Sequence, residues 1–94
     1  NGSGTPVLLS AKLDGNAFGI AVYGTFDGGT VTIEVALDGT NYAPMDTFTA
    51  AGFRNYITYV DNGSNVRATL AGATSPDINV LMSGAFTGIT RTDA

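Results

Sequence analysis

Apolar and polar residues alternate with a period of two along several stretches of this chain. The clearest stretch covers residues 30–37, and its apolar positions are Val31, Ile33, Val35 and Leu37. Because successive side chains of a β-strand point to opposite faces of a sheet, this pattern predicts a strand with one buried face. Helix is disfavoured throughout, since 13 glycines and many Thr, Val, Ile, Tyr and Phe residues suit turns and strands.

The same alternation predicts further strands along the chain. Residues 17–26 place Phe18, Ile20, Val22 and Phe26 on one face and Ala21, Tyr23 and Thr25 on the other. The following Asp27-Gly28-Gly29 is typical of a hairpin turn. Other strand-like stretches are 6–11, 42–48, 55–60, 65–71 and 78–86, and turn-like residues lie at 14–16, 38–41 and 61–64. Seven or eight short strands predict an all-β fold, a small antiparallel β-sandwich, for which a jelly-roll is one arrangement.

The length of 94 residues supports a single hydrophobic core, so residues 1–94 are expected to form one domain. The termini at 1–5 and 88–94 are small and polar, and we expect flexible arms there. Most of the core is expected to come from Phe18, Ile20, Val22, Val31, Ile33, Val35, Leu37, Val66, Ala68, Leu70, Ile78 and Val80.

The composition argues against several classes of function. Cysteine and histidine are both absent, which removes the commonest zinc ligands and the usual general base near neutral pH. The net charge is -4 and the four basic residues are scattered, so no basic stripe for nucleic acid is present. No apolar stretch is long enough to span a bilayer. We therefore expect a non-enzymatic protein without catalytic, cofactor or metal sites, which binds neither nucleic acid nor membrane.

The positions of the acidic residues suit roles in turns and ion pairs better than a role in catalysis. Seven of the eight are aspartates, mostly at expected turns, where aspartate caps its own backbone. Glu34 is the exception, and we expect a cross-strand pair with an arginine such as Arg54 or Arg67. An internal amide between Lys12 and Asn79, assisted by Glu34, is an alternative, but three unrelated surface residues are favoured.

Two features predict an interface. Tyr23, Tyr42, Tyr56 and Tyr59, with Phe53, suit either a protein interface or a stacking platform for sugar. The stretch 78–86 contains the consecutive apolar residues Val80, Leu81 and Met82. A single hydrophobic core can bury the side chains on only one face of such a strand. This strand therefore suits a central position or an edge covered by another subunit. The predicted interface residues are Leu81, Met82, Tyr56 and Tyr59.

Two runs carry a family resemblance. They are GTFDGGTVTIEVALDGTNYAPM, from Gly24 to Met45, and VRATLAGATSPDINVLMSG, from Val66 to Gly84. Together they resemble small β-sandwich virion proteins of tailed bacteriophages, in which a Gly-Thr-Phe strand end leads through glycines into a Thr-Val-Thr strand. The resemblance covers roughly half of the chain and includes no catalytic motif.

The resemblance implies a structural virion protein that decorates or stabilises the capsid, or a module of a fibre. Its expected partners are the major capsid protein or other virion subunits, and its expected location is the capsid exterior. It also implies a homo-oligomer, with a trimer favoured, because head decoration proteins often occupy local three-fold axes. An Ig-like adhesin or a carbohydrate-binding β-sandwich module, outside the cell or on its surface, is the alternative.

Overall fold

The computed structural model describes residues 7–57, 64–72 and 77–91, and within them the side chains of all residues except 13–16, 57, 85–88 and 91. The described residues form six strands, which are β1 (Val7–Thr25), β2 (Thr30–Ala36), β3 (Ala43–Phe48), β4 (Gly52–Ile57), β5 (Ser64–Ala71) and β6 (Asp77–Arg91). All observed pairings are antiparallel.

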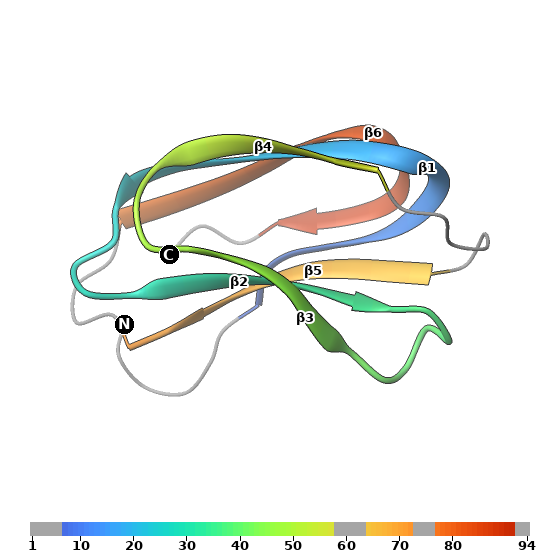
Figure 1. Cartoon of the computed structure of the whole chain (residues 1–94), viewed down its shortest axis with the longest axis horizontal. Coiled ribbons are helices and arrows are strands. Elements are labelled where there is room, and N and C mark those ends of the chain that lie inside the picture. Colours follow the sequence, from blue (N-terminus) through green and yellow to red (C-terminus); the bar gives the residue numbers. More distant parts are fainter. Residues whose placement is uncertain (1–6, 58–63, 73–76, 92–94) are drawn as a thin grey trace.

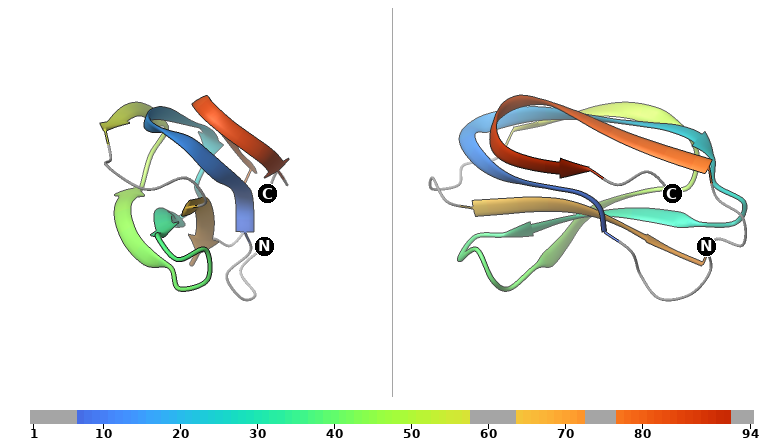
Figure 2. Two further views of the ribbon diagram at one scale, coloured as in Figure 1. Left: turned by 90° about the vertical axis from the view of Figure 1, so that its right-hand side faces the viewer. Right: turned by 180° about the vertical axis from the view of Figure 1, so that it is seen from behind.

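The strands form two packed sheets of five and three strands, which confirms the predicted all-β sandwich (Figure 1). β1 and β6 belong to both sheets, because each is long and bends over at one end of the molecule (Figure 2). The larger sheet has the order β3-β2-β5, followed by the first half of β1 and the second half of β6. The smaller sheet places the second half of β1 between β4 and the first half of β6.

The bend in β1 corrects one turn prediction. Residues 14–16 were expected to separate two strands, but β1 continues through them, with a register shift against β6 between Leu13 and Phe18. Gly84 of β6 pairs with Phe18 just beyond the shift and has a φ of 133°. A β-bulge with a glycine bends a strand without ending its pairing, so two predicted strands are one.

The turn at residues 27–29 also differs from its prediction. The turn is present, since the N–H of Gly29 donates to the carbonyl of Phe26 and Asp27 and Gly28 both have positive φ. It is not a hairpin, however, because β1 and β2 do not pair. The chain instead crosses here from the three-stranded sheet to the five-stranded sheet (Figure 1).

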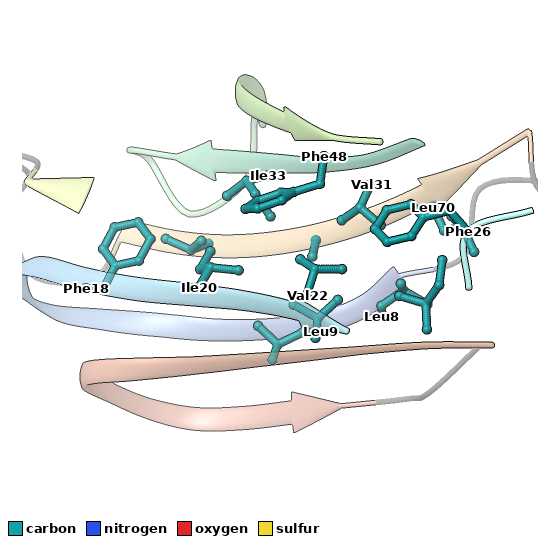
Figure 3. Close-up of a cluster of buried hydrophobic side chains, with 14 residues drawn as sticks. Leu8, Leu9, Phe18, Ile20, Val22, Phe26, Val31, Ile33, Phe48 and Leu70 are labelled. Atoms are coloured by element: carbon teal, nitrogen blue, oxygen red, sulfur yellow. The ribbon is translucent and has the colours of Figure 1, made fainter. Parts of the chain in front are cut away.

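The core lies between the sheets and is formed by the inward faces of both (Figure 3). Its members are Leu8, Leu9, Phe18, Ile20, Val22, Phe26, Val31, Ile33, Phe48, Val66, Ala68, Leu70, Ile78 and Val80. Ten of the twelve predicted core residues are among them. Val35 is only partly buried, and Leu37 was predicted wrongly: it lies beyond the end of β2, in the turn to β3, and is 65% exposed.

The last strand is longer than predicted. β6 extends to Arg91, and Thr90 and Arg91 pair with Ser10 and Leu9 of β1. Residues 88–91 of the expected C-terminal arm are therefore part of a sheet, because the long β1 provides a partner along their whole length. The expected arm at residues 1–5 and the remaining residues 92–94 lie outside the described part.

Candidate functional site

The outer face of the three-stranded sheet carries an exposed apolar cluster. Phe18, Ile20 and Val22 of β1 point into the core, so Ala21 and Tyr23 alternate with them onto the outer face. The strand register places Phe53 of β4 and Leu81 of β6 on either side of Ala21. Phe53, Tyr23 and Leu81 are 58%, 53% and 38% exposed. Large apolar side chains thus surround a small residue in the middle of the sheet.

A shallow depression of about 160 Å³ lies within this cluster, and we call it the sheet-face depression. Its lining residues are Gly19, Ala21, Tyr23, Phe53, Leu81, Met82 and Ser83. Gly19 contributes to it because it lacks a side chain: a Cβ there would lie 2.9 Å from Cζ of Phe53. The Phe53 ring therefore lies close over the backbone of β1. None of the seven lining residues is charged.

The structure separates the predicted interface residues. Leu81 and Met82 both line the sheet-face depression, although Met82 also packs against the core. Tyr56 lies on the other face of β4, where its ring stacks on Phe18 with centroids 5.1 Å apart. Tyr59 lies outside the described residues. The four residues are therefore not shown to form one surface, and their interface role stays a prediction.

The four aromatic residues of the expected platform that lie within the described structure are also separated. Tyr23 and Phe53 share the sheet-face depression. Tyr56 packs inward, and Tyr42 has one face covered by the guanidinium of Arg67, 3.7 Å from its ring centroid. Sequence alternation placed Tyr23 on the outer face, whereas Phe53 preceded the predicted strand at 55–60. Of these aromatics, Tyr23 and Phe53 are the pair that the described structure leaves together and accessible.

A polar cluster joins the edge strands β3 and β4, and we call it the edge clasp. Arg54 contacts Oδ1 of Asp46 at 2.8 Å and donates to the carbonyl of Thr47, and the Tyr56 hydroxyl donates to Oδ2 of Asp46 at 2.7 Å. The Arg54 guanidinium also lies 4.2 Å from the centroid of the Phe48 ring. Since β3 belongs to the larger sheet and β4 to the smaller, the edge clasp connects the two sheets along one side.

The contacts within the edge clasp shift the pKa values of Asp46 and Tyr56. The hydrogen bond from Arg54, followed by that from Tyr56, holds the pKa of Asp46 below its ordinary value of 3.8. Burial, and then the hydrogen bond to Asp46, raises the pKa of Tyr56 above its ordinary value of 10.0. The clasp therefore keeps a charged carboxylate and a neutral phenol at neutral pH. This pairing fits a structural connection rather than a proton-transfer site.

Acid is expected to weaken the fold through the edge clasp and the β2–β3 turn. In that turn the backbone N–H groups of Asn41 and Thr40 lower the pKa of Asp38 to about 2. A carboxylate whose folded-state pKa is depressed stabilises the fold above its unfolded-state pKa of 3.8, and this contribution is lost as pH falls through the folded-state pKa, which for Asp38 is about 2. Urea unfolding at a series of pH values should show a falling unfolding free energy in this window. The double variant Asp38→Asn/Asp46→Asn should show a flatter profile, and an unchanged acid slope would contradict this assignment.

A second ion pair joins Glu34 of β2 to Arg67 of β5. Arg67 Nε donates to Oε1 of Glu34 at 2.6 Å, which confirms the expected cross-strand pair. Lys12 pairs with Asn65 and Thr87, while Asn79 pairs with Tyr23 in the second half of β1. Lys12 and Asn79 therefore lie in different sheets, and both alternate with buried residues onto the outer faces, so the core between the sheets separates them. Within the described residues, no three His, Cys, Asp or Glu side chains gather in a group that could hold a metal.

One edge of β6 has no partner strand among the residues that the structure describes. The sequence suited this strand to either a central position or an edge, and the described structure places it at an edge. From Ile78 to Thr90 it carries neither charge nor proline. The other edge strands differ: β3 contains Pro44 and Asp46 with a register shift between them, and β4 is short and carries Arg54. Prolines, charges and bulges on edge strands block unwanted pairing. From Ile78 to Thr90 the outer edge of β6 therefore lacks charge and proline, and its pairing with β1 shifts register at two places, near the bend at Gly84 and between Thr87 and Thr90.

The described part of the chain contains no helix long and apolar enough to cross a membrane. Comparison of the chain with known protein families, with curated proteins and with solved structures found no match in any of the three.

Proposed function

We propose that this protein is a non-enzymatic structural component of a virion, which decorates or stabilises a bacteriophage capsid by binding its shell subunits. The observation that carries the proposal is the outer edge of β6, which offers a long uncharged template for another subunit. The resemblance of the runs at 24–45 and 66–84 to phage virion proteins supplies the kind of partner. The polar groups of Glu34, Asp46 and Arg54 are engaged in ion pairs, which accords with a structural role.

Association through an edge strand also accounts for a homo-oligomer, for which the resemblance favours a trimer. A strand added to β6 would satisfy backbone groups that otherwise face solvent, and it would extend either sheet. The other two edges are less suited to this role, because a proline and charged side chains disrupt strand addition there. An adhesin-like module remains the alternative, and it would bind a host surface without any shell.

The proposal predicts that the chain sediments with assembled capsids and that a charge on the edge of β6 weakens this association. Ile89→Lys introduces a lysine at a position that is 54% exposed on β6, away from the sheet-face depression. We expect a loss of roughly tenfold in capsid binding, measured by co-sedimentation on a density gradient, because the lysine must lose water when a partner strand covers it.

The matched control is Leu37→Lys, which makes the same change in charge at an exposed leucine in the β2–β3 turn. It should bind capsids as well as the unmodified protein does. Light scattering on each protein reports whether the oligomer depends on the same edge. Failure of the unmodified protein to sediment with capsids would remove the virion proposal, and equal binding by both lysine variants would remove β6 as the contact.

A further inference from the structure

The sheet-face depression combines three properties that restrict its ligand. Its walls are the accessible aromatic rings of Phe53 and Tyr23 together with Leu81. Its floor is the backbone of Gly19 and the small side chain of Ala21. Its lining contains hydroxyl groups, on Ser83 and Tyr23, but no charge. A ligand for this site therefore has an apolar face that packs on an aromatic ring and is itself neutral.

The outward-facing residues around the depression are also largely uncharged. The alternating positions of the three strands place Asn55, Asn79 and Thr25 on the same face, and the acidic residue of this face is Asp77, which pairs with Thr25 at the start of β6. Arg54 of β4 points to the opposite face, where it joins the edge clasp. An anionic or cationic ligand would thus find little charge complementarity, whereas amides and hydroxyls suit a ligand rich in hydroxyl groups.

Size argues against a protein as the occupant of this face. The three strands are six residues long in β4 and about eight in the paired parts of β1 and β6, so they present a face of at most roughly 14 by 26 Å, or about 400 Å². A stable interface between two proteins buries about 800 Å² on each partner. The depression is also smaller than the pockets of about 300–1,000 Å³ that enclose whole drug-sized ligands. It accommodates one ring of a longer molecule that continues along the sheet.

We propose that the sheet-face depression binds a neutral glycan, with one sugar ring stacked on Phe53 and flanked by Tyr23 and Leu81. The C–H groups on one face of a pyranose pack against an aromatic ring, while its hydroxyl groups reach the neutral polar side chains around it. This site uses a different surface from the edge of β6. It therefore adds a second binding activity to the proposed attachment and does not depend on it.

The test uses amide chemical-shift titrations of the full chain with six neutral hexasaccharides, namely cello-, xylo-, manno-, malto-, laminari- and fully N-acetylated chitohexaose. Sugar at about 10 mM reveals even millimolar affinity. We expect at least one of them to shift the amides of Gly19, Ala21 and Phe53 in a saturable manner. Phe53→Leu keeps an apolar side chain but removes the ring, and it should weaken binding by about tenfold, whereas Phe53→Tyr should retain it.

The control variant is Leu37→Ala, which removes an exposed leucine far from the depression and should leave the sugar titration unchanged. The proposal is overturned if none of the six sugars shifts the lining amides, or if Phe53→Leu binds as tightly as the unmodified protein. It is also overturned if these amides shift with protein concentration alone, since a second copy would then cover the face. Capsid binding by Ile89→Lys is measured separately, so the two proposals fail independently.

Discussion

Replacing Ile33 with aspartate is expected to unfold the domain. Ile33 is fully buried in the middle of β2, and it pairs with Asp46 of β3 and with Ala68 of β5. Removing its side chain from the core costs about 2–5 kcal/mol, and burying a carboxyl group without a partner adds several kcal/mol. A domain of 94 residues is stable by roughly 5–14 kcal/mol in total. The loss is therefore comparable with the whole free energy of unfolding.

The matched control for this change is Thr32→Asp. Thr32 precedes Ile33 and points to the opposite, partly exposed face of the larger sheet, where the same carboxylate keeps its contact with water. Its cost should stay within about 0.5 kcal/mol. Thermal melting followed by far-ultraviolet circular dichroism distinguishes the two variants. A cooperative melt for Ile33→Asp at the temperature of the control would show that β2 does not form the centre of the core.

Gly24→Ala is expected to destabilise the domain by roughly 2–5 kcal/mol. Gly24 lies near the end of β1 with a φ of 110°, a conformation that alanine rarely adopts. It pairs with Ile78, and a Cβ at Gly24 would lie only 1.8 Å from the carbonyl oxygen of Asp77. The obstructing atom belongs to the backbone of β6, so relief requires the two strands to move apart. The change thus combines backbone strain with the loss of strand pairing.

Gly52→Ala is the control for Gly24→Ala, and its expected change in the free energy of unfolding has the opposite sign. A Cβ at Gly52 would meet Phe48 at 3.8 Å, which is an ordinary contact, and the residue lies in β4 without a positive φ. Alanine here restricts the unfolded chain and should stabilise the domain by about 0.4–1 kcal/mol. Urea unfolding of both variants measures the two effects. Equal stabilities would contradict the close approach of β1 and β6 at Gly24.

Local sequence patterns predicted the faces of the strands better than their partners. The alternation around Ile20 and Ile33 identified the buried faces correctly, because it depends only on neighbouring residues. The turn at residues 27–29 was also predicted correctly, but the connection that it makes between the two sheets was not. Whether such a turn joins paired strands or two different sheets depends on β5, which occupies the position beside β2 that a hairpin would give to β1.

The sheet-face depression, too, was predictable from the sequence only where it depends on neighbouring residues. Tyr23 was placed on the outer face by alternation, and Leu81 was recognised because it belongs to a run of consecutive apolar residues that one core can bury on only one side. The position of Phe53 over Gly19 follows from the register between β4 and β1, which pairs strands far apart in the sequence. No local signal specifies that register. The inward position of Tyr56 has no local signal for the same reason, since its neighbours Phe18 and Asp46 come from other strands.

The bent ribbon of β1 and β6 has a consequence for the order in which the chain can fold. It joins residues as distant in sequence as Leu9 and Arg91, and it supplies two of the three strands of the smaller sheet. Closing so long a loop carries a large entropic cost before any contact compensates it, and topologies of this kind fold slowly. Until β6 is available, the second half of β1 can pair only with β4. A ribosome must therefore release almost the entire domain before either sheet can be completed.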